Sequence, residues 1–220
     1  MDEDELSIVD LDNTIYDTDR LIRDLKVEIE MRVGHISSQK FWSCYEQVRL
    51  ETGAVDLTRT LELCAALVRC QDHVRLVDLI WNFPNPESYV IDGAIATLRY
   101  LRGRGKVMIM TDGERLFQES KILGSGLVHE VDQYLVYPGK TKHFLSVAAE
   151  NPSSVVNILD DKPSVAADAR QLFGAKARII MVAYGKYGAG LLQDGCEDAD
   201  VIIGSISDLP AAHQRLVAQH

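Results

Sequence analysis

Cysteine is scarce in this 220-residue sequence, and none of it forms a CxxC pair or a metal-ligand cluster. The four cysteines are Cys44, Cys64, Cys70 and Cys196. This scarcity excludes a disulfide framework, so we expect the thiols to be reduced and mostly buried. Long apolar runs are lacking too, because no stretch approaches the ~20 residues of a membrane-spanning helix. The acidic start, Asp2 to Glu5, is not typical of a signal peptide. These absences predict a cytoplasmic protein with no membrane partner.

Positive charge is also in short supply. Lysine and arginine number 23 against 33 aspartates and glutamates, which gives a formal net charge of −10. Because a nucleic-acid backbone attracts a cationic surface, this balance excludes a general nucleic-acid binder. A small phosphorylated substrate is not excluded, since a bound divalent cation and one lysine supply local positive charge. The basic stretch from Arg99 to Lys106 is typical of a solvated helix end, and the six histidines form no ligand-spaced pair.

Apolar runs and helical patterns alternate from Asp92 onward, and Asp92 is the predicted N-cap of the first helix in this series. The patterns predict strands at 106–110, 131–136, 155–159, 178–182 and 201–203, and helices at 92–101, 115–123, 141–150, 163–173 and 207–217. With a first strand at 6–9, this alternation is typical of a doubly wound parallel α/β sheet.

The segment 15–89 is different, because its apolar residues recur only at helical spacing. Four such stripes begin at Ile22, Phe41, Leu57 and Val74. Four short helices can make a small bundle with its own core. Because the segment directly follows the first strand, we expect an insertion that lies over the strand ends. The alternative is that these helices pack on the main sheet. The predicted division is therefore an α/β core of residues 1–14 and 90–220, and a helical insertion of residues 15–89.

Two carboxylates follow the first apolar run, in the sequence Leu6-Ser7-Ile8-Val9-Asp10-Leu11-Asp12. If residues 6–9 form a strand, Asp10 and Asp12 emerge at its carboxyl end, where parallel α/β sheets bind ligands. One carboxylate there can attack as a nucleophile while its neighbour handles protons, and both are close enough to share a cation. By itself this DxD pattern is weak, because acidic pairs are common at strand ends.

Three further motifs follow in order. The run 106–110 ends in Thr111-Asp112-Gly113, Lys140 follows a proline and a glycine, and the run 155–159 ends in Asp160-Asp161. This order, DxDxT, then threonine, lysine and an acidic pair, resembles the haloacid dehalogenase superfamily over roughly residues 6 to 203. The resemblance implies a Rossmann-like core, and it identifies the helical insertion as a C1-type cap between the first and second motifs.

The resemblance also implies roles for the motif residues. Asp10 would attack phosphorus, and Asp12 would protonate the leaving group and then activate water, while its backbone carbonyl reaches the metal. Members that cleave carbon–halogen bonds lack an acid at the second position, so Asp12 favours phosphoryl transfer over dehalogenation. Thr111 would bind the phosphoryl oxygens through its hydroxyl, with the backbone N–H groups of Asp112 and Gly113.

A lysine and an acidic pair complete the implied site. Lys140 would neutralise a phosphoryl oxygen and keep Asp10 ionised. Lys142 is a rival, but Lys140 is preferred because Phe144 and Leu145 resemble the first turn of the next helix. Asp160 and Asp161 would hold Mg²⁺ together with Asp10 and Asp12, since Mg²⁺ prefers oxygen ligands. Which of the two binds the ion directly stays open.

The sequence therefore predicts a Mg²⁺-dependent phosphatase that hydrolyses a small phosphate monoester through an aspartyl-phosphate. Two alternatives remain: a phosphotransferase or phosphomutase that shares the first half-reaction, and a weakly catalytic binding or regulatory protein on the same fold. The expected partner is a small phosphorylated substrate, and the chain is expected to be a monomer or homodimer.

Overall fold

The computed structural model describes residues 4–52, 55–83, 85–153 and 155–218 and contains one parallel six-stranded sheet. Its strands are β1 (Glu5–Val9), β2 (Gly105–Asp112), β3 (Gln133–Tyr137), β4 (Val155–Asp160), β5 (Ala177–Val182) and β6 (Val201–Ile203). Their spatial order is β3-β2-β1-β4-β5-β6, so the order in which successive strands are added to the sheet reverses between β1 and β4. Such a reversal leaves a crevice at the carboxyl ends of the two strands, where open α/β sheets bind ligands. The prediction of a doubly wound α/β fold is confirmed.

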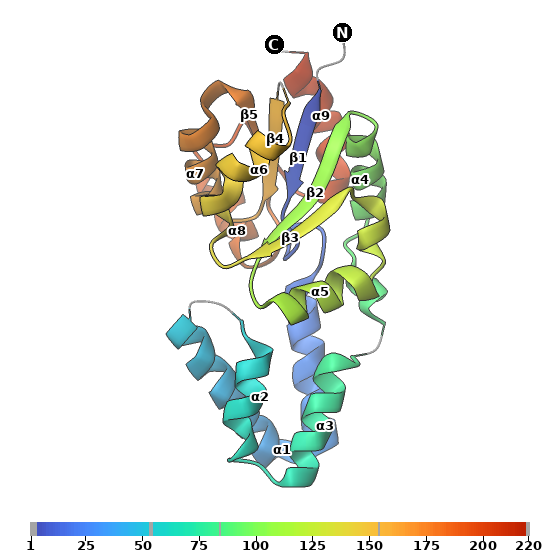
Figure 1. Cartoon of the computed structure of the whole chain (residues 1–220), viewed down its shortest axis with the longest axis vertical. Helices are drawn as coiled ribbons and strands as arrows, with labels where there is room; N and C mark the ends of the chain where they lie inside the picture. The colour runs from blue at the N-terminus through green and yellow to red at the C-terminus, as the bar shows by residue number, and fades with distance from the viewer. Residues whose placement is uncertain (1–3, 53–54, 84, 154, 219–220) are drawn as a thin grey trace.

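Side chains of the strands alternate between two buried layers, as a sheet covered on both faces requires. In β1, Leu6 and Ile8 belong to one apolar cluster and Val9 belongs to the other. The first cluster packs under α6 (Phe144–Glu150), α7 (Pro163–Phe173) and α8 (Gly185–Asp194). The second packs under α4 (Ala94–Arg102), α5 (Arg115–Gly124) and α9 (Leu209–Val217), which lie on the opposite face (Figure 1).

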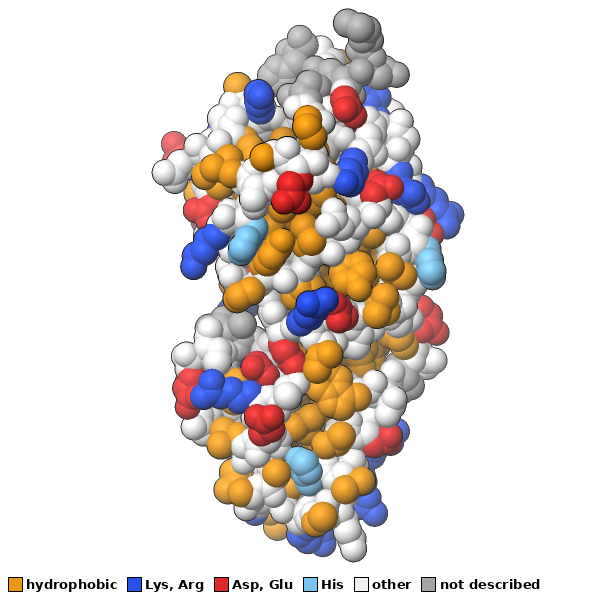
Figure 2. All heavy atoms as spheres, in the orientation of Figure 1, with side chains coloured by type: hydrophobic (Ala, Val, Ile, Leu, Met, Phe, Trp, Pro, Cys, Tyr) orange, Lys and Arg blue, Asp and Glu red, His pale blue; other side chains and the backbone are white. Residues whose placement is uncertain are grey.

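Three helices lie beyond the carboxyl ends of the strands rather than on a face of the sheet (Figure 1). They are α1 (Thr18–Thr52), α2 (Leu57–Ala65) and α3 (Cys70–Trp81). In the space-filling view the outline of the molecule is indented on one side between this helical part and the sheet (Figure 2). Glu114, which precedes α5, ties the two parts together, because its carboxylate accepts hydrogen bonds from the Leu57 N–H (3.0 Å) and the Thr58 hydroxyl.

The prediction of four short helices in this segment is confirmed. The first two apolar stripes both lie in α1, which consists of two helices on either side of a kink at Gly34. Gly34 has a φ of 77° and a ψ of 166°, a conformation that glycine adopts without steric cost. The helix is therefore interrupted at Gly34, and a second helix begins directly after it.

Several predicted boundaries also need correction. Asp92 is not the N-cap of α4, because Gly93 occupies that position with a φ of 85°. The predicted helix 141–150 begins as a 3₁₀ turn, Lys140–His143, before α6. Helix α8 was not predicted at all. Of the cysteines, Cys44 and Cys64 are buried, whereas Cys70 is exposed and Cys196 is half-buried, so only half of them fit the expectation. Within the described residues no helix has the length and the apolar character needed to cross a membrane.

Candidate functional site

Asp10 lies at the point between β1 and β4 where the strand order of the sheet reverses. Val9, the last residue of β1, is level with Leu159 of β4, and the Asp10 N–H donates to the Leu159 carbonyl at 2.9 Å. Asp10 and Asp160 are therefore neighbours across the two central strands. Both are only 2% exposed. The apolar strands thus deliver two buried carboxylates to one crevice, as predicted from the run that precedes each of them.

Lys140 lies between these two carboxylates and is itself 1% exposed. Its ammonium forms an ion pair with Asp10 and a second one with Asp160 at 2.6 Å. Gly139, with a φ of 75°, turns the chain into the site, and the Lys140 N–H donates to the Asp112 carboxylate at 2.7 Å. Burial lowers the pKa of Lys140, but the two aspartates outweigh it and raise the pKa above its ordinary value. Lys142, the rival from the sequence, is exposed.

Asp161 completes a group of three buried acids with Asp10 and Asp160. One carboxylate oxygen from each lies within 4.8 Å of the others. Burial, with repulsion between the acids, raises the pKa of Asp10 to about 6 even though Lys140 lowers it. Burial and the charges of Asp10 and Asp160 raise the pKa of Asp161 to about 8. The site therefore holds more negative charge than its lysine neutralises.

Two oxygens of this group fit a divalent cation. Asp10 Oδ2 and Asp161 Oδ1 are buried and have no hydrogen-bond partner. Asp160 differs, since its two oxygens accept from the Lys140 ammonium and from the Lys162 N–H at 3.0 Å. Unpartnered buried carboxylate oxygens are costly unless a cation binds them, and hard divalent cations take such ligands. The residues present thus match an oxygen-coordinated metal ion.

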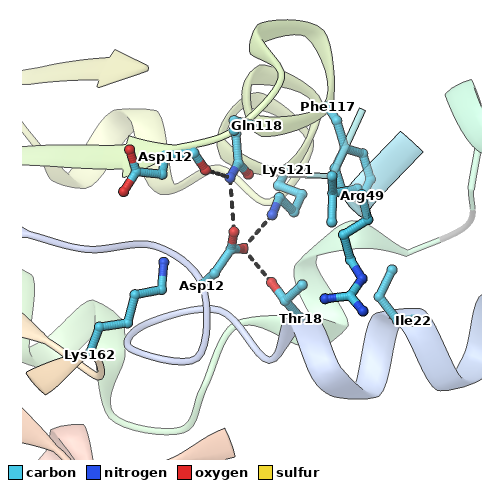
Figure 3. A pocket seen from close by; sticks show the side chains of 11 residues that line it. Asp12, Thr18, Ile22, Arg49, Asp112, Phe117, Gln118, Lys121 and Lys162 are labelled. Atoms are coloured by element: carbon cyan, nitrogen blue, oxygen red, sulfur yellow. Dashed lines mark hydrogen bonds and ion pairs between the residues drawn. The ribbon is translucent and has the colours of Figure 1, made fainter. Parts of the chain in front are cut away.

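Asp12 points to a different set of partners. The chain turns sharply after it, with Asn13 at a φ of 59°. The Asp12 carboxylate accepts from Gln118 at 2.8 Å and from the Thr18 hydroxyl, and it forms an ion pair with Lys121 (Figure 3). Burial raises the pKa of Asp12, but Lys121 and these hydrogen bonds outweigh it, so the pKa lies below its ordinary value. The Asp12 carboxylate lies outside the group of three acids.

The end of β2 brings Thr111, Asp112 and Gly113 to the same edge of the sheet. Gln118 holds this turn, because its amide donates to the Asp112 carbonyl at 2.6 Å and to the Thr111 hydroxyl at 3.2 Å. Gly113 has a φ of 139°, and a Cβ there would lie 2.8 Å from the Gln118 amide nitrogen. Only glycine fits so closely against Gln118 without displacing it.

A pocket of about 200 Å³ lies beside Asp12 and is lined by residues of both the sheet and the helical part (Figure 3). The sheet side supplies Asp12, Asp112, Gly113 and Lys162, α5 supplies Phe117, Gln118 and Lys121, and the helical side supplies Thr18, Ile22, Arg49 and Val55.

Sequence reasoning missed five of these polar residues: Thr18, Arg49, Gln118, Lys121 and Lys162. Three of them left a usable signal. Gln118 and Lys121 are three residues apart, which places them on one face of the helix that follows the Thr111 motif. Lys162 directly follows the acidic pair.

Comparison with known proteins agrees with this geometry. The family of haloacid dehalogenase-like hydrolases matches residues 6–183. A structure described as a haloacid dehalogenase-like hydrolase from Burkholderia xenovorans LB400 is 27% identical and has a TM-score of 0.86, covering 98% of this chain and 99% of that chain. The L-2-haloacid dehalogenase from Xanthobacter autotrophicus is 13% identical, with a TM-score of 0.58 over 96% and 98% of the two chains.

A Thermotoga maritima protein described as a β-phosphoglucomutase is 14% identical, with a TM-score of 0.59 over 96% of this chain and 99% of that chain. The likeness to this protein and to the Xanthobacter enzyme is one of fold alone, and the two names stand for different reactions. A search of curated proteins found no match.

Proposed function

Because the chain belongs to the haloacid dehalogenase-like hydrolases, we propose that it is a Mg²⁺-dependent phosphatase that hydrolyses a small phosphate monoester through an aspartyl-phosphate. The observation that carries this proposal is the buried Asp10 carboxylate, with one oxygen paired to Lys140 and the other without a partner. A carboxylate placed in this way, at the reversal point of the sheet, is oriented for attack on a ligand in the crevice.

In the proposed first step, Asp10 attacks phosphorus while Lys140 holds its other oxygen. The Thr111 hydroxyl and the backbone N–H groups of Asp112 and Gly113 would bind the phosphoryl oxygens. Asp12 would protonate the departing alcohol, and in the second step it would accept a proton from the attacking water. A divalent cation held by Asp10, Asp160 and Asp161 would offset the charge of two anions that approach one another.

Asp12 supports phosphoryl transfer over dehalogenation. A halide leaves without a proton, whereas an alkoxide needs one, so a second acid serves only the phosphate reaction. Lys121, Gln118 and Thr18 hold the Asp12 carboxylate beside the pocket. This set of partners favours a positioned acid–base group over a simple turn residue.

Residues 15–89 would act as the cap, over a core of residues 1–14 and 90–220. The helical part contributes Ile22, Arg49 and Val55 to the pocket, so a leaving group would contact both parts. Such a lid would exclude bulk water from the aspartyl-phosphate and would select for small substrates.

The proposal is tested by phosphate release from a panel of phosphate monoesters, with Mg²⁺ and with EDTA. We expect metal-dependent release by the wild type, and a fall of at least about 1,000-fold in Asp10→Asn, because the nucleophile is lost. Asp92→Asn, an exposed aspartate in the loop before α4, is the matched control and should behave as the wild type.

Three outcomes would contradict the proposal. Release that persists in EDTA or in Asp10→Asn would show that another site or a contaminant is responsible. Transfer of the phosphoryl group to a sugar, with no free phosphate, would favour a phosphotransferase or phosphomutase. An absence of any turnover, with no trapped aspartyl-phosphate, would favour a binding or regulatory role.

A further inference from the structure

Three lysines reach the proposed site, and two of them already have carboxylate partners. The Lys140 ammonium is paired with both Asp10 and Asp160. Lys121 is fully buried and paired with Asp12. Neither ammonium is free to meet an incoming anion unless an existing ion pair is weakened.

Lys162 is different. It follows Asp161 at the start of α7, and its N–H is fixed to the Asp160 carboxylate at 3.0 Å. Its side chain is half-buried and lines the pocket, where it extends toward the space between Asp12 and Asp112 (Figure 3). Among the described residues, its ammonium has no hydrogen-bond or ion-pair partner within contact distance. The positive charge of Lys162 is therefore available to a ligand.

The negative charges around Lys162 explain why an ammonium without a carboxylate partner would assist substrate binding. The carboxylates that act on it most strongly are Asp10, Asp160 and Asp161. A phosphate monoester would have to approach these carboxylates closely, and the like charges would repel it. With Lys140 held by two aspartates, a second ammonium at the pocket would lower that repulsion at the place where the substrate enters.

We propose that Lys162 binds the phosphoryl group of the substrate. Unlike Lys140 and Lys121, it can do so without first breaking an ion pair with a carboxylate. This inference rests on the proposed function for the identity of the ligand. It predicts a contact that is common to all substrates, because every phosphate monoester carries the same phosphoryl oxygens.

The test compares three variants of the full chain with the wild type. Lys162→Met removes the charge and keeps the length of the side chain, and Lys162→Arg restores the charge. Lys142→Met is the matched control, because Lys142 is exposed and lies outside the pocket. The first readout is binding of inorganic phosphate and orthovanadate in the presence of Mg²⁺, measured by calorimetry, which needs no turnover. The second is KM and kcat for p-nitrophenyl phosphate and for monoesters that carry a second anionic group.

We expect Lys162→Met to weaken phosphate and orthovanadate on the order of 10- to 100-fold, the range of one charge-assisted hydrogen bond. KM should rise by a similar factor for every ester. Lys162→Arg should recover most of this loss, and Lys142→Met should stay within about twofold of the wild type.

Three results would overturn the inference. In the first, Lys162→Met binds both inorganic anions as the wild type does and loses affinity only for doubly anionic esters, so that Lys162 contacts the leaving group. In the second, Lys162→Met has no effect on any ligand. In the third, the wild type binds neither anion. If the wild type binds phosphate but hydrolyses no ester, and Lys162→Met weakens that binding, the proposed function fails while the anion contact is supported.

Discussion

Glu5 begins β1 and Asp10 follows its last residue, so one strand carries a buried carboxylate at each end, but only Glu5 has partners for both of its oxygens. Arg104 and Arg178 lie 3.1 and 3.2 Å from Oε1. The Asn157 amide donates to Oε2 at 3.0 Å, and the His213 ring lies 3.1 Å from the same oxygen. Both oxygens of Glu5 thus have neighbours that donate hydrogen bonds or carry positive charge.

The other end of β1 has the opposite balance. Asp10 faces two more carboxylates, and one oxygen of Asp10 and one of Asp161 lack a partner. Burial would raise the pKa of Glu5, but His213, Asn157 and Arg104 lower it to about 2, whereas the pKa of Asp10 is raised to about 6. Equal burial therefore has opposite consequences. A saturated carboxylate, in which both oxygens have partners, contributes to stability. An unsaturated carboxylate, with an oxygen that lacks a partner, indicates a site that binds a ligand.

The largest expected effect is at the saturated end. Glu5→Gln removes the buried charge with which Arg178 and Arg104 form ion pairs, and breaking a buried pair costs about 3–5 kcal/mol. For a chain of this size we expect Tm to fall by roughly 6–20 °C. Thermal unfolding followed by circular dichroism measures the change.

Glu51→Gln is the matched control, because Glu51 pairs with Arg59 at the surface and exposed pairs contribute about 1 kcal/mol or less. If Glu5→Gln lowers Tm no more than Glu51→Gln, the two ends of β1 do not differ in the way described above.

The second effect is at the unsaturated end and separates Asp160 from Asp161. Asp161→Asn removes the carboxylate with a free oxygen, so we expect Mg²⁺ affinity to fall by at least about 100-fold. Asp160→Asn changes a carboxylate whose two oxygens already accept hydrogen bonds from the Lys140 ammonium and the Lys162 N–H. Its effect should stay within the roughly 10- to 100-fold that is typical of residues that orient metal ligands. Calorimetric titration with Mg²⁺ gives both values.

The reverse ranking, with Asp160→Asn the weaker binder, would mean that Asp160 is the direct ligand and that the free oxygen of Asp161 has another purpose.

In EDTA at pH 8, Asp161→Asn should be at least as stable as the wild type, because it removes a repelling charge. Glu5→Gln should be less stable than the wild type under the same conditions. The two variants, Asp161→Asn and Glu5→Gln, therefore compare the two ends of β1 directly.

The sequence predicts these two ends very unequally. The acids at the carboxyl end were found because each follows an apolar run, and parallel strands bring such positions together. The Glu5 network was not found, because its partners are 99, 152 and 173 residues away along the chain. Arg104 was interpreted as part of a solvated helix end, which was wrong: Gly105 pairs with Glu5 in the sheet, and this pairing brings Arg104 beside the buried carboxylate.

The missed side chains and the missed helix have local causes. Lysines on helices and loops are most often solvated, so the residue type alone does not distinguish Lys121 and Lys162, and only their positions in the sequence give a signal. Helix α8 begins Gly-Lys-Tyr-Gly-Ala-Gly, and three glycines in its first two turns give it a low helix propensity. Its formation depends on packing of Leu191 against the sheet, which is a tertiary effect.

The third effect is a pH dependence with opposite sign at the two ends. Asp10 and Asp161 have pKa values of about 6 and 8, above their unfolded value of 3.8. The folded chain then binds more protons than the unfolded chain between pH 4 and 8, so its stability falls as the pH rises through this range. Glu5, with its lowered pKa, contributes stability that is constant above pH 4.5 and is lost only as the pH falls toward 2.

We therefore expect Tm in EDTA to decrease by several degrees between pH 5 and pH 8, and to stay nearly level when Mg²⁺ is present. Asp161→Asn should remove most of the slope, whereas Glu51→Gln should leave it unchanged. A metal-free Tm that rises over this interval would show that the acids are not held in mutual repulsion.

The smallest expected effect concerns Asp12, which resembles Glu5 in having its charge satisfied but lies at the functional end. Lys121→Met removes the cation that holds the pKa of Asp12 below its ordinary value. The pKa of Asp12 should rise, and the step that needs Asp12 as a base should lose rate at low pH. With p-nitrophenyl phosphate, whose leaving group needs no proton, we expect the acid limb of kcat to move up by about one pH unit or less.

Gln118→Leu should move the acid limb in the same direction by a smaller amount, because a neutral hydrogen bond is lost instead of a charge. Arg115→Met, on an exposed part of α5, should leave the limb in place. An unchanged acid limb in Lys121→Met would mean that Lys121 stabilises the fold as the Glu5 partners do, without setting the charge of the proposed acid–base group.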